Sequence, residues 1–261
     1  MQIDSIHNPR IKNLLKLQQK SRERKKQGLF VVEGIQENQL AMESGFEAVE
    51  LYCVDVLFQS AFELKSGKIF QLSPTLFEKI AYRGTSGGIL GIYQAKNQKL
   101  TEINLPKNPI IIILESVEKP GNLGAILRSC DGANIDLLIV CDPLVDFYNP
   151  NVIRSSVGTL FTNSWLVAEK EEVVQWLKSN GIQIVSTFLH NNTKSLYEID
   201  FKQSTAIVLG TEASGLSDFW IENSDSWIKI PMKGKVDSLN VSNAAAICMY
   251  EALRQRENSE Q

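Results

Sequence analysis

The sequence predicts an α/β protein built from two domains, and three observations support this. Its 261 residues exceed the roughly 150 residues of an ordinary domain. A hydrophobic fraction of 43% and a charged fraction of 22% are typical of soluble globular proteins. Short apolar runs alternate with stretches of helical periodicity, and this alternation stops at the polar residues 97–108 before it starts again. We therefore expect an N-terminal domain at 1–96, a linker at 97–108 and a second domain at 109–261.

The N-terminal domain is predicted to begin with an amphipathic helix over residues 9–28. Pro9 suits a first helical position and Gly28 a helix end, while Ile11 and Leu14 share one face. Runs rich in β-branched and aromatic residues then predict short strands, with a helix between the last two. The strands are expected at 29–33, 49–54, 68–72 and 89–94, and the helix at 76–82.

The second domain is predicted to hold a mostly parallel sheet covered by helices. Its apolar runs are short and uninterrupted, as in parallel strands that are buried on both faces. Strands are expected at 110–114, 137–141, 182–186, 206–209 and 227–230. Helices are expected at 125–133, 169–179 and 238–256.

The charge of the chain is unevenly distributed. The formal net charge is −3 at pH 7, but residues 1–28 hold eight Lys or Arg and two acidic residues, which gives +6 there and −9 elsewhere. A local positive potential attracts polyanions even on an acidic protein. The basic segment therefore indicates contact with nucleic-acid phosphates, or else a lysine-rich helix face that is only solvated.

Several protein classes find little support in this sequence. The longest aliphatic run, residues 110–114, is far shorter than the roughly 20 residues that span a bilayer, and the N-terminus lacks an apolar signal segment. We therefore expect a cytoplasmic protein with no membrane segment. Two histidines and four scattered cysteines offer little material for a metal site, so we expect reduced packing residues at Cys53, Cys130, Cys141 and Cys248.

Two polar segments follow predicted strands of the second domain. In the first, the strand at 110–114 leads through a Pro-Gly turn into a helix that carries Asn122 and Arg128. Free N–H groups at a helix start attract anions, although an ordinary turn with Asn122 as the cap explains this segment as simply. The second, residues 210–215, forms a tight glycine turn where backbone can approach a flat ligand, with Glu212 at its rim. A glycine loop without a ligand is the alternative.

A third polar segment, residues 230–244, precedes and enters the predicted final helix. Ser238, Asn240, Ser242 and Asn243 gather there. One cap satisfies only one or two backbone donors, so this group exceeds what capping requires. The excess favours a functional site.

Together and in this order, the three segments resemble the SpoU family of RNA ribose methyltransferases, which belongs to the SPOUT superfamily. The patterns are Asn-x-Gly-x-x-x-Arg from Asn122, Leu-Gly-x-Glu-x-x-Gly from Leu209, and Ile-Pro-Met-x-Gly-x-x-x-Ser-Leu-Asn-Val-Ser from Ile230. Residues 30–34 of the first domain resemble a small ribosomal-protein-like α/β RNA-binding domain that many SpoU enzymes carry in front.

The resemblance implies a parallel sheet whose C-terminal part forms a deep trefoil knot, with S-adenosylmethionine bound in that knot. By the family pattern, the cofactor contacts fall on Leu209, Gly210, Ile230, Met232 and Leu239. Apolar side chains with free backbone polar groups suit an adenine ring, which needs a slot and a few hydrogen bonds.

The reaction that the resemblance implies is transfer of a sulfonium methyl group to a ribose 2'-hydroxyl, without a metal. Arg128 would lie beside the reacting hydroxyl and a phosphate, with Asn122, Glu212, Ser238 and Asn240 around it. Because an arginine side chain stays protonated, we expect Arg128 to hold the phosphate and stabilise the developing alkoxide, and not to act as a base.

The resemblance also implies a homodimer that acts on structured RNA, and ribosomal RNA above all. The final Ala-rich helix is the candidate interface, with packing inside its own subunit as the alternative. Among the basic residues, we place Lys25, Lys26 and Arg83 nearest to RNA. The alternatives are a tRNA ribose methyltransferase, a non-catalytic RNA-binding or ribosome-assembly protein, and a methyltransferase for a base or a small molecule.

Overall fold

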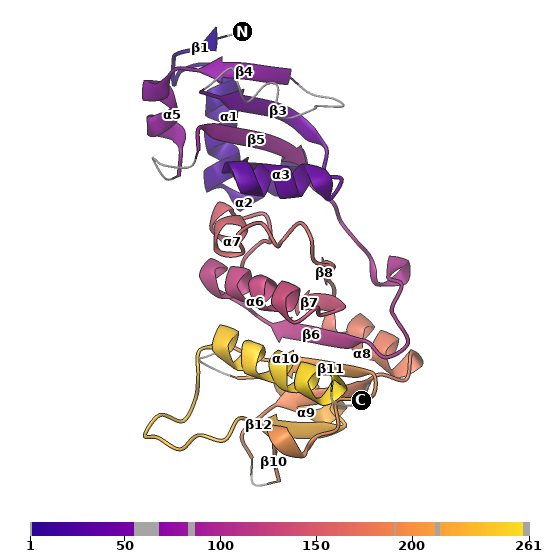
Figure 1. Cartoon of the computed structure of the whole chain (residues 1–261). Coiled ribbons are helices and arrows are strands. Elements are labelled where there is room, and N and C mark those ends of the chain that lie inside the picture. Colours follow the sequence, from indigo (N-terminus) through magenta and orange to yellow (C-terminus); the bar gives the residue numbers. More distant parts are fainter. Residues whose placement is uncertain (1, 55–67, 83–86, 191, 212–214, 258–261) are drawn as a thin grey trace. The chain divides into compact units, whose positions relative to one another are not determined.

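The computed structural model describes residues 2–54, 68–82, 87–190, 192–211 and 215–257, and in this part of the chain the predicted α/β fold is confirmed (Figure 1). The chain divides into two compact units. The first comprises Met1–Lys96 together with Asp146–Thr162, and the second comprises Asn97–Val145 together with Asn163–Gln261. No helix among the described residues combines the length and the apolar character needed to cross a membrane.

The first unit holds a five-stranded mixed sheet in the order β1-β4-β3-β5-β2. β1, β4 and β3 run parallel, whereas β5 is antiparallel to both of its neighbours. The four strands expected here are confirmed within one residue, and a short N-terminal strand is added. Their bounds are β1 Gln2–Ile3, β2 Leu29–Glu33, β3 Ala48–Cys53, β4 Lys68–Leu72 and β5 Ile89–Gln94.

The single helix expected over residues 9–28 is wrong, because two helices meet at Lys20. α1 spans Pro9–Gln19 and α2 spans Ser21–Gln27, and Lys20 between them is extended, with φ −122° and ψ 109°. The side chain of Arg24 accounts for the break. Its Nη1 donates to the carbonyl oxygens of Leu17 and Gln18 at 2.7 and 3.1 Å, and so satisfies acceptors that a continuous helix would have used itself.

Helices cover both faces of the first sheet. α1 and α5 (Pro74–Ile80) pack on one face, where Leu14 and Phe77 contact Val31 and other buried apolar residues. α3 (Ile35–Glu43) packs on the other face, and there the Tyr93 hydroxyl donates to the Asn38 Oδ1 at 2.9 Å. α3 is absent from the sequence-based prediction.

Residues 146–162 pack into the first unit through an ion pair and stacked rings. The Nε and Nη2 groups of Arg24 donate to the two carboxylate oxygens of Asp146, at 3.0 and 2.6 Å, and the Arg24 side chain is only 5% exposed. Tyr148 stacks on Phe30, with ring centroids 4.1 Å apart. α7 (Pro150–Ser155) follows within this segment. The packing of the first unit is therefore completed by residues far along the chain.

The second unit holds a seven-stranded sheet in the order β10-β12-β9-β11-β6-β7-β8, and every pair is parallel. The mostly parallel sheet expected there is confirmed. The strands are β6 Ile110–Glu115, β7 Leu137–Cys141, β8 Trp165–Val167, β9 Gln183–Thr187, β10 Lys194–Ser195, β11 Thr205–Leu209 and β12 Ser226–Lys229. β8 and β10 are short and were not expected from the sequence.

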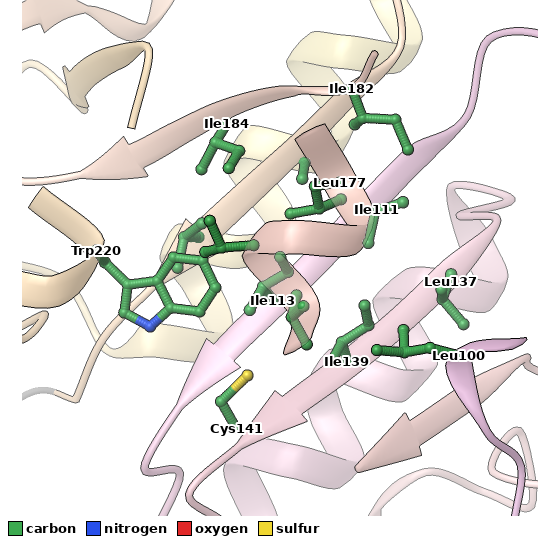
Figure 2. Packing of buried hydrophobic residues seen from close by; sticks show 14 of the residues in the cluster. Leu100, Ile111, Ile113, Leu137, Ile139, Cys141, Leu177, Ile182, Ile184 and Trp220 are labelled. Atoms are coloured by element: carbon green, nitrogen blue, oxygen red, sulfur yellow. The ribbon is translucent and has the colours of Figure 1, made fainter. Parts of the chain in front are cut away.

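Two pairs of helices cover this second sheet. α8 (Lys170–Ser179) and α9 (Asp218–Asn223) enclose a core that contains Ile113, Ile139 and Trp220 (Figure 2). α6 (Pro120–Gly132) and α10 (Val241–Glu257) pack side by side on the opposite face (Figure 1). α6 begins five residues earlier than expected because Pro120 occupies its first turn, and α10 begins three residues later.

The four cysteines are free and buried, which confirms their prediction as packing residues. Burial raises the pKa of the Cys53 thiol to about 11 and the pKa values of Cys130, Cys141 and Cys248 to about 12. A thiol with so high a pKa is almost entirely neutral at physiological pH and is a poor nucleophile or metal ligand. Among the described residues, no group of three or more His, Cys, Asp or Glu side chains could hold a metal ion.

Candidate active site

The candidate active site lies where two central strands of the second sheet end. β6 and β11 are adjacent and parallel, with Leu114 opposite Leu209. Glu115 and Gly210, the residues that come next, therefore meet at the same edge of the sheet. Ligands of open parallel sheets bind at this carboxyl edge.

One cavity at this edge is lined by all five residues that the family pattern assigns to the cofactor. Its volume is about 390 Å³, within the range of small-molecule sites. Leu209 and Gly210 come from the end of β11, whereas Ile230, Met232 and Leu239 come from the loop between β12 and α10. Two segments about 20 residues apart thus form one mostly apolar wall.

The turn after β11 requires glycine at position 210. A Cβ on Gly210 would collide with the carbonyl carbon and oxygen of Gly215, because the backbone folds back on itself there. Thr211 and Gly215 exchange backbone hydrogen bonds at 3.2 and 3.1 Å across this turn, and Gly215 has a left-handed φ of +69°. Close approach of a flat ligand to bare backbone is what such a turn permits, so the residues present fit an adenosyl group.

A second cavity of about 190 Å³ adjoins the first and shares Leu209, Gly210, Thr211 and Val241 with it. Its other walls come from the end of β6 and the start of α6, and include Glu115 and Asn122. A ligand in the first cavity would therefore lie next to the cavity that Asn122 lines.

Asn122 and Asn240 come together from opposite ends of the second unit's sequence. The Asn240 amide Nδ2 donates to the Asn122 Oδ1 at 3.2 Å. The Asn240 Oδ1 accepts from the Ser242 backbone N–H at 2.9 Å and from the Ser242 hydroxyl at 2.6 Å, so Asn240 also caps α10. Capping of α10 thus explains why Asn240 and Ser242 stand at the start of this helix. The hydrogen bond to Asn122 gives Asn240 a second role.

The remaining residues of the predicted catalytic group are not all brought together. Ser238 is exposed and lines the larger cavity. Arg128 is exposed on α6, six residues after Asn122, and lines neither cavity. Glu212 lies outside the described residues.

Glu115 is a site residue to which the sequence reasoning gave no role. Its side chain is buried, and its carboxylate accepts from the Ser217 backbone N–H at 2.7 Å and from the Ser217 hydroxyl at 2.6 Å. Lys170 lies 3.6 Å from this carboxylate and 3.4 Å from that of Asp142. The sequence does contain a sign of this role. Glu115 directly follows the apolar run of residues 110–114, so it continues the same buried strand.

The charges around Lys170 also determine its protonation. Partial burial lowers the pKa of the ammonium group, but the carboxylates of Asp142 and Glu115 outweigh it and raise the pKa above its ordinary value. Lys170 is therefore a permanent cation in the physiological range. It offsets part of the negative charge of Glu115, whose carboxylate binds Ser217 shortly after the end of β11.

The basic residues assigned to RNA are only partly described. Lys25 and Lys26 are exposed on α2, whereas Arg83 lies outside the described residues. Their neighbour Arg24 is buried and holds Asp146, so it is not free to contact a phosphate. Exposed cations of the first 28 residues are Lys12, Lys16, Lys20, Arg22, Lys25 and Lys26.

The final helix carries one buried face and one partly exposed face. Ala245, Cys248, Met249 and Ala252 are buried within the second unit, while the Tyr250 side chain is 51% exposed. One apolar face of α10 is therefore covered by its own chain.

Comparison with known proteins agrees with this arrangement. The SpoU rRNA methylase family model matches residues 109–250, and the model of an MRM3-like substrate binding domain matches residues 8–91. The 23S rRNA (guanosine(2553)-2'-O)-methyltransferase of Bacillus subtilis is 28% identical over 95% of this chain and 98% of its own length.

Two solved structures extend over nearly the whole chain. A crystal structure of an RNA 2'-O ribose methyltransferase is 34% identical, with a TM-score of 0.84 over 98% of this chain and 100% of the other. The SpoU methyltransferase AviRb of Streptomyces viridochromogenes, in complex with the cofactor AdoMet, is 28% identical, with a TM-score of 0.86 over 96% of this chain and 100% of the other. The family model covers more than half of the chain, and the present chain therefore belongs to the SpoU rRNA methylase family.

Proposed function

We propose that this protein transfers the methyl group of S-adenosylmethionine to a ribose 2'-hydroxyl of ribosomal RNA. The observation that carries the proposal is the pair of adjoining cavities at the carboxyl edge of the second sheet. All five residues expected at the cofactor line the larger cavity, and Asn122 lines the smaller one. The relatives named above supply the substrate class.

Leu209, Gly210, Ile230, Met232 and Leu239 would hold the cofactor, with backbone polar groups of these segments reading the adenine edge. When bound, S-adenosylmethionine supplies a methyl group made electrophilic by its sulfonium. Asn122, Ser238 and Asn240 would orient the attacking ribose beside it, and alignment of this kind can contribute up to about 7–11 kcal/mol in ideal cases. Glu212 belongs to the same proposed group.

Arg128 is proposed to hold the RNA phosphate next to the target ribose. Its planar guanidinium can donate two hydrogen bonds to one phosphate and stays charged throughout. The charge stabilises the alkoxide that develops as the 2'-hydroxyl oxygen bonds to the methyl carbon and the carbon–sulfur bond breaks. The hydroxyl proton passes to that phosphate or to water. Arg128 is exposed on α6, where RNA can reach it.

The first domain is proposed to recognise the RNA, as the match to a substrate-binding model suggests. We place this domain at 1–96, the linker at 97–108 and the catalytic domain at 109–261. Lys25, Lys26 and Arg83 would contact phosphates. The acidic remainder of the chain makes this basic segment the point of first encounter.

Three further properties complete the proposal. The second domain would carry the deep trefoil knot of SPOUT enzymes, and the protein would work in the cytoplasm. Two copies would form a homodimer through the part of α10 that includes Tyr250, because its other face is already covered. Sedimentation of the wild type and of Tyr250→Glu measures the dimer directly.

The decisive experiment treats RNA from cells that lack this protein with the purified protein and S-adenosylmethionine labelled in its methyl group. Mass mapping of ribose methylation should find a single 2'-O-methyl nucleotide in ribosomal RNA. A methylated ribose in tRNA would show that the substrate is tRNA, and a methylated base would show that the protein is a base methyltransferase. Cofactor binding without any product would favour a ribosome-assembly protein.

A further inference from the structure

A cavity in the first unit has no part in the site described above. Its volume is about 350 Å³, and its residues come from β2, the start of α3 and α7, with Gln18, Tyr82 and Gly87. Val31, Gly34 and Ile153 are buried in its walls, whereas Ile35 and Tyr82 are 41% and 55% exposed at its rim. Large apolar side chains that stay exposed around a cavity are typical of a binding site.

The rim of this cavity is held in place by specific contacts. The Tyr82 backbone N–H donates to the Glu33 carboxylate at 2.6 Å, and the guanidinium carbon of Arg154 lies 5.4 Å from the centre of the Tyr82 ring. Gly87 has a left-handed φ of +76°, and a Cβ there would lie 3.0 Å from the Ile35 side chain. The exposed ring of Tyr82 is therefore anchored at its backbone and covered in part by a cation.

The polar groups of the cavity distinguish between kinds of ligand. Among the described residues that line it, Glu33 and Glu37 contribute two carboxylates, Arg154 contributes one guanidinium, and Gln18 and Gln36 add two amides. An excess of negative charge disfavours a phosphate. It favours a flat ring whose edge donates hydrogen bonds, because a carboxylate accepts from an amino group of a base while an aromatic ring stacks on its face.

We propose that this cavity holds one unpaired nucleobase of the RNA substrate, stacked on Tyr82 with an exocyclic amino group turned toward Glu37. The inference rests on the proposed function, because it takes RNA as the substrate, and it adds a base-specific contact to a unit otherwise assigned only phosphate contacts. Adenine, cytosine and guanine carry such an amino group, and uracil does not.

The test uses the full chain and fluorescence anisotropy with the 12-nucleotide single strands r(C)12 and r(U)12, at several salt concentrations. The wild type should bind r(C)12 more tightly than r(U)12. Tyr82→Ala should weaken binding of r(C)12 by about 5- to 150-fold, the range for loss of one base–aromatic stack, while Tyr82→Phe retains it. The slope of log affinity against log salt should stay unchanged, because no phosphate contact is removed.

Two variants complete the experiment. Glu37→Gln should abolish the preference for r(C)12 over r(U)12. Tyr197→Ala, at a tyrosine of the second unit that is 59% exposed, should bind both strands as the wild type does. The proposal is overturned if Tyr82→Ala binds r(C)12 like the wild type, if Tyr82→Phe binds it as weakly as Tyr82→Ala, or if the wild type does not distinguish the two strands.

Failure here is separable from failure of the proposed function. If the wild type methylates ribosomal RNA while Tyr82→Ala binds RNA normally, the cavity is not a base site and the enzyme activity stands. If Tyr82→Ala weakens binding as expected while no RNA is methylated, the base site stands and the activity does not.

Discussion

Asn122 and Asn240 lie 118 positions apart in the chain and share a hydrogen bond of 3.2 Å, which joins the start of α6 to the start of α10. Asn240 serves two structural purposes at once, since it also caps α10 with its other amide atom. Substitutions at Asn240 can separate these purposes from a role in catalysis.

Asn240→Asp should keep the cap and lose methyl transfer. An aspartate oxygen caps a helix as well as asparagine does, and the bond to Asn122 that is lost lies at an exposed site, so the free energy of unfolding in urea should stay close to that of the wild type. The side chain can no longer donate to a substrate oxygen. Asn240→Ala should lose about 1 kcal/mol of stability as well. Normal turnover by Asn240→Asp would reduce Asn240 to a helix cap.

Arg128→Lys should bind S-adenosylmethionine normally and turn over about 10²-fold more slowly, a loss comparable to that of one oxyanion donor. The charge remains, but the planar fork that grips a phosphate with two hydrogen bonds is gone. Because Arg128 is exposed, its replacement should leave thermal unfolding unchanged. Single-turnover methylation of ribosomal RNA measures the effect, and a near-normal rate would contradict the phosphate clamp.

Gly210→Ala should lose at least tenfold in affinity for S-adenosylmethionine, measured by calorimetry. The new Cβ would displace Gly215, and the turn that lines both cavities would open. Gly234→Ala is the matched control, because this glycine lies in the loop after β12 with open space where its Cβ would stand. Equal affinities of the two variants would show that the turn tolerates expansion.

Glu115 and Ser217 should be energetically coupled. Glu115→Ala, Ser217→Ala and the double variant form a cycle, and we expect an interaction free energy of about 1–3 kcal/mol in urea unfolding, because the hydrogen bond has a charged acceptor and is partly buried. Ser217→Ala keeps its backbone N–H bond to Glu115, so it should cost less than Glu115→Ala. Additive effects would mean that the two side chains act independently.

Lys25→Glu/Lys26→Glu should weaken RNA binding at least tenfold and reduce its salt dependence, with cofactor affinity unchanged. The control is Lys194→Glu/Lys202→Glu, which makes the same change of charge at two exposed lysines of the second unit. A uniform loss in both double variants would indicate a general effect of charge and no local contact. Unchanged RNA affinity in the first would remove these lysines from the interface.

The sheet of the second unit was predictable because its strands are buried on both faces. Ile110–Glu115 and Leu137–Cys141 are almost wholly apolar, and uninterrupted apolar runs of this length are typical of buried parallel strands. Short α9 and the three-residue β8 lack that signature, since their conformation depends on neighbours that are distant in sequence. α3 was hidden for a similar reason, because its buried residues include the polar Asn38, whose amide is satisfied by Gly34 and Tyr93.

The candidate site divides in the same way. Residues that lie directly after strands, such as Leu209 and Gly210, could be placed from the sequence because parallel strands end at one edge. The bond between Asn122 and Asn240 and the hold of Glu115 on Ser217 could not, because each joins segments more than 100 residues apart. Arg24 shows the opposite case. Its place in a lysine-rich segment suggested an exposed cation, but its side chain is buried in an ion pair with Asp146.

That ion pair also bears on the order in which the protein can be made. Asp146 leaves the ribosome 122 residues after Arg24, and the ring of Tyr148 that stacks on Phe30 comes later still. Until then the guanidinium of Arg24 has no carboxylate to hold and one face of Phe30 stays bare. Although its strands are the first to emerge, the N-terminal unit therefore reaches its final packing only when more than half of the chain has been translated.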